Sequence, residues 1–264
     1  MTEAIFIVFA SPIFALVLGL LIGSFLNVVV VRLPQKKSIV FPPSQCTSCK
    51  AKIRWWDNIP VVSYIFLLGK CRNCRKKISF RYPVIELLTG LLFLTARIRF
   101  GWSPLLFIHD WPFLALLVAI TFIDLEHRII PDSLSLGGLV LGLTTSWFVP
   151  SFGLSSALIG AGVGFGVFYL LAWGYEKYSG VMGLGGGDIK LLAMLGSFVG
   201  LGGVYATILI ASVFGSLIGI GWGLVTGKKG LMKVSIPFGP FLVFGALYYY
   251  FLGEIYWFQF TNPI

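Results

Sequence analysis

The chain has 264 residues, of which 57% are apolar and 11% are charged, and its mean hydropathy is +0.92. Soluble domains average roughly 25% charged residues, so this composition excludes an ordinary soluble domain, a disordered chain and a disulfide-rich miniprotein. The formal net charge is +10, and the long apolar runs predict an all-α, polytopic membrane helical bundle.

Eight apolar runs are candidates for transmembrane helices, because a helix needs roughly 20 apolar residues to cross a bilayer. The first run follows Glu3 and lacks the basic start of a secretory signal, so we expect a retained helix. The runs are continuous rather than alternating in polarity, which favours helices over barrel strands. The eight expected spans are residues 5–31, 83–100, 111–126, 133–149, 154–175, 188–203, 205–226 and 237–257.

Basic residues are distributed very unevenly between the two sides of these spans. With eight spans, 18 of the 20 Lys and Arg residues fall on one side, twelve of them in the loop 32–82, while Arg97 and Arg99 fall on the other. The positive-inside rule makes the basic side cytoplasmic and places both termini outside. We expect the basic loop to meet anionic membrane lipids rather than nucleic acid, since no nucleic-acid-binding module accompanies its charge.

Glycines recur four residues apart inside the expected spans. Small residues at this spacing allow helix backbones to approach closely. The pattern fits either a dimer interface or packing within the bundle, and we expect packing. The pairs are Gly160 and Gly164, Gly162 and Gly166, Gly215 and Gly219, and Gly219 and Gly223.

All four cysteines of the chain lie in the loop 32–82, as Cys46-x-x-Cys49 and Cys71-x-x-Cys74. Two such pairs are typical of a tetrahedral Zn²⁺ site, in which each pair supplies two thiolates. Because four thiolates leave no open position for a substrate, we expect the zinc to be structural. Two disulfides or free thiols are the alternatives, and a reducing cytoplasm disfavours the disulfides.

Two aspartates fall at the ends of expected spans on the same, basic side of the membrane. Asp124 ends the third span, and Asp188 opens the sixth span after the glycines 185–187. Charges at membrane depth are costly and usually functional. Two close carboxylates cannot both ionise cheaply, so one can activate water while the other protonates a carbonyl, as in aspartyl proteases. Each could instead be a helix-end charge, and Asp132 is a competing partner or an N-cap.

These segments together resemble the bacterial type IV prepilin peptidases, also called prepilin leader peptidase/N-methyltransferases. Residues 185–188 fit the G-x-G-D signature of intramembrane aspartyl proteases, and the paired C-x-x-C loop also matches. The other matching segments are Gly23-Ser24-Phe25-Leu26-Asn27-Val28-Val29, Tyr82-Pro83-Val84-Ile85-Glu86-Leu87-Leu88, the stretch from Asp124 to Asp132, and Ile236-Pro237-Phe238-Gly239-Pro240.

The resemblance implies a membrane aspartyl endopeptidase of the bacterial inner membrane, with an active site that faces the cytoplasm. Its substrates would be type IV prepilin or pseudopilin precursors, and its catalytic residues Asp124 and Asp188. The long first cytoplasmic loop belongs to the form that also methylates the new N-terminus with S-adenosyl-L-methionine. Glu86 and Asn27 are candidates for contacts with that methyl donor.

Two other classes of function stay open on the sequence. A proton-coupled transporter would also use membrane aspartates, as a relay, whereas a non-enzymatic, zinc-clipped assembly platform would need neither aspartate. Whichever function the chain has, we expect its sequence to divide into three parts. These are a first transmembrane helix (residues 1–31), a cytoplasmic zinc-binding loop (32–82) and a seven-helix membrane domain (83–264) that carries both aspartates.

Overall fold

The computed structural model of the protein describes residues 11–150, 152–180, 185–226 and 237–256. Within these residues the chain is helical, and its β pairing is limited to two isolated antiparallel bridges, Gln45–Lys52 and Lys70–Lys77. The chain forms two compact units, Met1–Ala119 and Ile120–Ile264. The all-α prediction is therefore confirmed.

The first unit is built on two long helices that pack against each other, α2 (Pro12–Arg32) and α4 (Arg81–Phe100). A Cβ atom added to Gly19 would lie 2.7 Å from the Cα atom of Gly90, and one added to Gly23 would lie 2.6 Å from the Cα atom of Glu86. The two backbones approach this closely because α2 has no side chains at these positions. The loop between them contains η1 (Trp55–Asn58) and α3 (Val62–Phe66), and η2 (Leu106–Asp110) leads into α5 (Trp111–His127).

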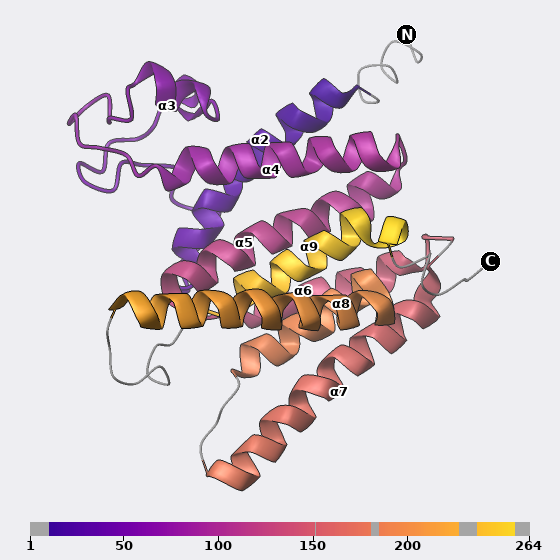
Figure 1. Cartoon of the computed structure of the whole chain (residues 1–264). Helices are drawn as coiled ribbons and strands as arrows, with labels where there is room; N and C mark the ends of the chain where they lie inside the picture. Colours follow the sequence, from indigo (N-terminus) through magenta and orange to yellow (C-terminus); the bar gives the residue numbers. More distant parts are fainter. Residues whose placement is uncertain (1–10, 151, 181–184, 227–236, 257–264) are drawn as a thin grey trace. The chain divides into compact units, whose positions relative to one another are not determined.

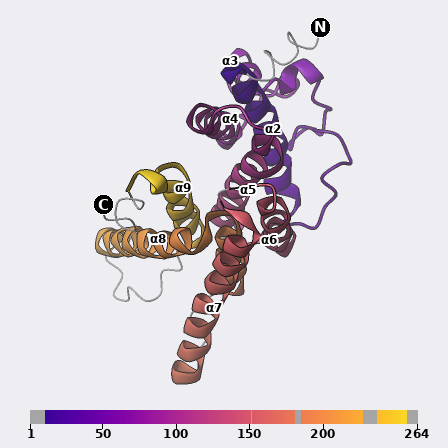
Figure 2. The ribbon, with the colours of Figure 1, turned by 90° about the vertical axis from the view of Figure 1, so that its right-hand side faces the viewer.

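In its described residues, the second unit contains the end of α5 and four further helices. They are α6 (Asp132–Ser146), α7 (Gly153–Ser179), α8 (Gly186–Thr226) and α9 (Gly239–Tyr256). α8 bends at Gly200, whose φ of 66° is a conformation that glycine adopts readily. The first half of α8 packs against α7, and the second half runs beside α9 (Figures 1 and 2).

The glycine pairs of α7 divide into two groups. Cβ atoms added to Gly160 or Gly164 would collide with backbone atoms of α8, at Gly196 and Leu192 respectively. Cβ atoms added to Gly162 or Gly166 would meet nothing within 4 Å. The expected packing within the bundle is therefore confirmed for Gly160 and Gly164, which form the close contact between α7 and α8.

The structure supports several membrane crossings but does not confirm the count of eight. Among the described residues, four helices are long and apolar enough to cross a membrane, and Gly239–Gly253 is a shorter apolar helix. The expected spans 188–203 and 205–226 correspond to the two helical segments of α8, which are separated by the non-helical backbone of Gly200. α6 has only 15 residues, and α4 carries Glu86, Arg97 and Arg99, which lower its hydropathy. Residues 5–10 and 257 of the expected spans lie outside the described residues. The four helices are Pro12–Arg32, Leu106–His127, Gly153–Ser179 and Gly186–Gly221.

We predict that Gly160→Ala destabilises the protein and that Gly162→Ala, on the same helix, does not. The added methyl group at position 160 would press on the carbonyl oxygen of Gly196, a backbone atom that cannot move aside. Overpacking of this kind costs about 1–3 kcal/mol, whereas alanine in an open helical position is favoured over glycine. Thermal unfolding in detergent measures both variants, and equal midpoints would contradict the assigned contact.

Candidate functional site

Asp124 lies in the last turn of α5 and is buried, with 5% of its surface exposed. Its Oδ2 atom accepts a hydrogen bond from the backbone N–H of Gly239, with 3.0 Å between nitrogen and oxygen. A Cβ atom at position 239 would lie 2.6 Å from that oxygen. The absence of a side chain at the start of α9 therefore allows the carboxylate to reach the backbone.

Asp188 lies in the first turn of α8 and is half-buried. Its backbone N–H donates to the carbonyl oxygen of Gly185 at 3.0 Å, which closes the turn that leads into the helix. Its Oδ2 atom lies 3.2 Å from the position of a Cβ atom at Gly185. The glycines before Asp188 thus keep the backbone open around its carboxylate.

Ile130 packs against both aspartate segments and so brings them to one place. A Cβ atom on Gly187, the residue before Asp188, would lie 3.1 Å from the Cβ atom of Ile130. A Cβ atom on Gly239, the residue that binds Asp124, would lie 3.4 Å from the Cδ1 atom of Ile130. The two carboxylates are also close enough for their charges to interact. The structure therefore gathers the ends of α5, α8 and α9 around a pair of carboxylates.

Asp132, the competing candidate, has a different partner. Its carboxylate is exposed and forms an ion pair with Lys190, with 2.7 Å between Nζ and Oδ1. It occupies the first position of α6, where the preceding Pro131 is the N-cap residue. Asp132 thus connects α6 to α8 two residues after Asp188, and the alternative that it is the N-cap of α6 is wrong.

The four cysteines come together at the surface of the first unit. Their Sγ atoms all lie within 4.8 Å of one another, and Cys46 and Cys74 are 3.8 Å apart. None of the four is in a disulfide bond. This arrangement could hold a metal ion, as the spacing of the two pairs predicts.

The two C-x-x-C turns have the same backbone hydrogen bonds. Cys46 N–H donates to the carbonyl of Ala51 at 2.9 Å, and Cys71 N–H donates to that of Lys76 at 2.9 Å. In each turn the residue after the second cysteine, Lys50 or Arg75, has a φ of 59°. The sequence repeat therefore produces two matching turns, each of which presents a pair of sulfur atoms.

The chemistry of this donor set fits a tetrahedral cation. The backbone N–H of Cys49 lowers the pKa of Cys46, and that of Cys74 lowers the pKa of Cys71. The N–H of Lys76 acts in the same direction on Cys74, but desolvation and the neighbouring thiols raise its pKa to about 11. Four thiolates at this distance repel one another, so a bound cation is needed to ionise the last one.

Asn27 and Glu86 lie on facing surfaces of α2 and α4 and are both buried. The Asn27 amide donates to the carbonyl of Tyr82 at 3.1 Å, but its Oδ1 atom has no hydrogen-bond partner among the described residues. Glu86 accepts the backbone N–H of Val61, with 2.7 Å between the atoms. This bond connects α4 to the loop that contains the cysteines.

Some residues of the site carry no charge or thiol and were not assigned a role from the sequence. Gly239 belongs to the segment 236–240 that matched the family, but the sequence did not indicate that its N–H binds Asp124. Ile130 is an ordinary apolar residue in a loop, and no sequence signal distinguishes it. Backbone donors and packing residues can be found only once the helices have been placed.

The fold and site define a class of protein, a helical membrane protein with a carboxylate pair at the ends of its helices, as an intramembrane aspartyl protease requires. The chain belongs to the type IV leader peptidase family, whose model matches residues 111–220. A second model, described as the bacterial peptidase A24 N-terminal domain, matches residues 17–100. The predicted family resemblance is confirmed.

Curated relatives cover most of the chain. A prepilin leader peptidase/N-methyltransferase of Neisseria gonorrhoeae is 36% identical over 90% of this chain and 91% of its own length. The protein of the same name in Myxococcus xanthus is 41% identical over 83% of this chain and 66% of its own length. A type 4 prepilin-like proteins leader peptide-processing enzyme of Escherichia coli is 38% identical over 94% of this chain and 96% of its own length. No solved structure matches the chain.

Proposed function

We propose that this protein is an endopeptidase that removes the leader peptide of type IV prepilin or pseudopilin precursors. The observation that carries the proposal is the gathering of Asp124 and Asp188, with the N–H of Gly239, at the ends of three helices. The family, and relatives named prepilin leader peptidase, support the same activity. They do not favour a transporter or an assembly platform.

Peptide hydrolysis by this pair requires one carboxylate to be ionised and the other to hold a proton. The ionised carboxylate removes a proton from water, which attacks the scissile carbonyl carbon, while the protonated carboxyl group donates its proton to the carbonyl oxygen. The tetrahedral intermediate then collapses: the proton taken from water passes to the leaving nitrogen, the C–N bond breaks, and the hydroxyl proton returns to the second carboxylate. The N–H of Gly239 fixes one oxygen of Asp124 and so orients that carboxylate for proton transfer. The ion pair of Asp132 and Lys190 holds the start of α6 beside the start of α8.

We predict that Asp124→Asn and Asp188→Asn each abolish leader removal, because an amide cannot exchange the proton that the reaction moves. The expected loss is at least about 10²–10⁴-fold, the usual contribution of general acid–base catalysis. The double variant should be no worse than either single variant, because the two residues act as a unit. Mass spectrometry of a co-expressed precursor measures leader removal directly.

Asp132→Asn is the matched control for this experiment and should retain cleavage, because its carboxylate is exposed and paired with Lys190. If the Asp132 variant were inactive while the Asp124 variant still cleaved, the catalytic pair would instead be Asp132 and Asp188. Normal cleavage by all three variants would contradict an aspartyl protease mechanism at these residues.

We further propose that the cysteine cluster binds one structural Zn²⁺ ion. Cys46, Cys49, Cys71 and Cys74 would hold it, and all four positions of a tetrahedral site would be filled by sulfur. The bound metal supplies a cross-link between two turns of an exposed loop, and it takes no part in the cleavage. Many large apolar side chains of this loop are exposed, so its described residues do not form a substantial hydrophobic core of their own.

We predict that the purified protein contains about one zinc ion per chain and that Cys71→Ser lowers both its zinc content and its thermal stability. The substitution removes one of four thiolates and leaves the site incomplete. Ser48→Ala, between the cysteines of the first pair, is the control and should keep the metal. Metal-free wild-type protein with four titratable thiols and unchanged stability would exclude the site.

Methylation of the new N-terminus with S-adenosyl-L-methionine is the second activity that we propose, because the relatives are named N-methyltransferases. Asn27 and Glu86 remain the candidates for contacts with the donor. The buried Oδ1 atom of Asn27 has an unused acceptor position in the described structure, and the Glu86 carboxylate lies on the facing helix. A processed pilin that gains no methylene mass in the same spectra would exclude the second activity.

The orientation of the protein in the inner membrane is also a proposal, and the uneven distribution of basic residues supports it. We predict that a cysteine introduced at Ser38 is protected from an impermeant thiol reagent in intact cells, whereas one introduced at Ser103 is labelled. Ser103 lies between the second and third expected spans, on the opposite side. Labelling of the Ser38 variant from outside would reverse the topology.

A further inference from the structure

The basic loop between α2 and α4 contains one stretch without any charge. The loop holds twelve Lys and Arg residues, yet no charged residue lies between Asp57 and Lys70. An apolar run of about 10–14 residues is too short to span a bilayer and is typical of a buried helix or of an interfacial or re-entrant segment. The run, called the apolar segment below, is Ile59-Pro60-Val61-Val62-Ser63-Tyr64-Ile65-Phe66-Leu67-Leu68-Gly69.

The structure leaves the large side chains of the apolar segment exposed instead of burying them in a core. Ile65, Phe66 and Leu68, in and just after α3, have 63%, 83% and 81% of their surfaces exposed. Phe80, which is 70% exposed, extends this patch to the start of α4, because its ring centroid lies 6.3 Å from that of Tyr64. Apolar patches of this kind mark contact with a partner or with a membrane.

The backbone of the apolar segment supplies its own hydrogen-bond partners. The N–H groups of Ser63, Ile65 and Leu67 each donate to the carbonyl four residues earlier, with 2.9–3.1 Å between nitrogen and oxygen. The N–H of Gly69 donates to the carbonyl of Tyr64 at 2.8 Å. Backbone polar groups that enter a bilayer have to be satisfied without water. The segment meets this requirement.

Contacts between α2 and α4 give the depth of the neighbouring residues. The two helices are antiparallel, since Asn27 of α2 donates to the carbonyl of Tyr82, and Gly23, one turn earlier in α2, packs against Glu86. α2 is long and apolar enough to cross a membrane, and it ends at Arg32. The rise of α2 from Gly23 to Arg32 is about 13 Å. Glu86 therefore lies well inside the length of α2.

Glu86 holds α3 at this depth. Its Oε2 atom accepts the N–H of Val61, the residue before α3, at 2.7 Å. α3 therefore lies beside the first turns of α4 rather than beyond its start (Figure 1). Lys70 and Lys77 are exposed and pair in an antiparallel bridge directly after the apolar segment. Apolar side chains at depth with lysines next to them fit the boundary between acyl chains and anionic headgroups.

We propose that the apolar segment is a membrane anchor, held at depth by Glu86, which inserts Ile65, Phe66 and Leu68 among the acyl chains of the adjacent leaflet. The loop 32–82 would then not lie wholly in the cytoplasm. A protein partner could also cover an apolar patch, but the depth of Glu86 beside α2 favours lipid at this one. The inference rests on the membrane crossing of α2 and is independent of the peptidase activity.

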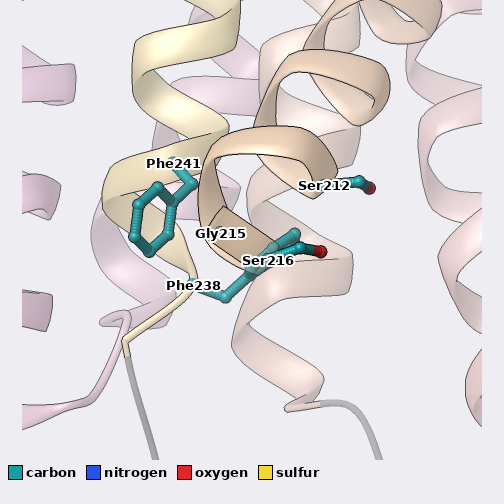
Figure 3. Close-up of a pocket in the computed structure, with 5 residues that line it drawn as sticks. All are labelled: Ser212, Gly215, Ser216, Phe238 and Phe241. Carbon is teal, nitrogen blue, oxygen red and sulfur yellow. The ribbon is translucent and has the colours of Figure 1, made fainter. Parts of the chain in front are cut away.

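The test identifies what touches position 66. Photoreactive benzoyl-phenylalanine replaces Phe66 in the full-length protein, which is reconstituted into vesicles of phosphatidylethanolamine and phosphatidylglycerol and irradiated. Mass spectrometry should find phospholipid joined to position 66. Position 217 is the lipid-facing reference, because Leu217 is 62% exposed on a helix apolar enough to cross the membrane, and the preceding Ser216 points away from the rings of Phe238 and Phe241 (Figure 3).

Phe41 is the matched control for Phe66. It is the same residue type in the same loop and is 75% exposed, but it lies outside the apolar segment and outside any helix. Since an irregular backbone needs water for its polar groups, the photoreactive residue at position 41 should form few lipid adducts.

Two variants test the role of Glu86. Glu86→Ala removes the acceptor for the N–H of Val61 and should lower the yield of lipid adducts at position 66 towards that at position 41. Glu86→Gln keeps an acceptor oxygen and should preserve the yield.

Three results would overturn the anchor. They are equal lipid adducts at positions 41 and 66, adducts of position 66 with a second copy of the chain instead of lipid, and no lipid adduct at position 66 when position 217 forms one. Unchanged adducts in Glu86→Ala would overturn the hold assigned to Glu86. The comparison of positions 41 and 66 keeps Glu86 in place, so it decides the question even if Glu86→Ala fails to fold.

Discussion

The hydrogen bond from Gly239 to Asp124 is the interaction on which the arrangement of the site depends. It joins residues 115 positions apart and can form only because position 239 has no side chain. It fixes the start of α9 against the end of α5. That placement in turn puts Phe238 at the edge of a pocket and brings Ile130 between the two aspartate segments.

Glycine has a similar role in the helix packing that supports this contact. Gly160 of α7 packs on Gly196 of α8, and Gly245 of α9 packs on Thr207 of α8. Because lipid gives little hydrophobic driving force for helix association, close van der Waals packing between small residues has to provide it. α8 can serve both neighbours because it bends at Gly200 between the two contacts. The helices that carry the site are therefore held by backbone contacts at glycines together with fully buried apolar side chains such as Ile123, Leu191 and Leu242.

The loop with the cysteines is stabilised by local hydrogen bonds and an ion pair rather than by close packing of helices. Its two turns are stabilised by local backbone hydrogen bonds, and the bidentate bond of Arg72 to Asp57, with a shortest distance of 2.6 Å, adds a further connection. The Arg72 guanidinium donates hydrogen bonds to the Asp57 carboxylate and so lowers its pKa. Glu86 joins the loop to α4 through the N–H of Val61. A metal cross-link suits such a loop, since large apolar side chains such as Phe41, Trp55 and Phe66 are exposed instead of packing into a core.

The sequence by itself determined the features that depend on local pattern. Apolar runs predicted the helices, and the spacing of two cysteine pairs predicted their gathering. These two predictions succeed because hydropathy and short spacings are properties of neighbouring residues. Charges at span ends indicated Asp124 and Asp188, whose catalytic role stays a prediction. The count of eight spans is not confirmed, because hydropathy does not fix helix length: α6 has only 15 residues, and the two segments of α8 meet at a kink at Gly200.

Only the tertiary structure decided which residues became partners. It paired Asp132 with Lys190, gave Asp124 the N–H of Gly239, and selected Gly160 rather than Gly162 for packing. The glycines of α7 have the same local spacing, so their sequence alone could not distinguish them. Partner choice depends on which faces of distant helices meet, and that is fixed by the packing of the whole unit rather than by any short segment of the chain.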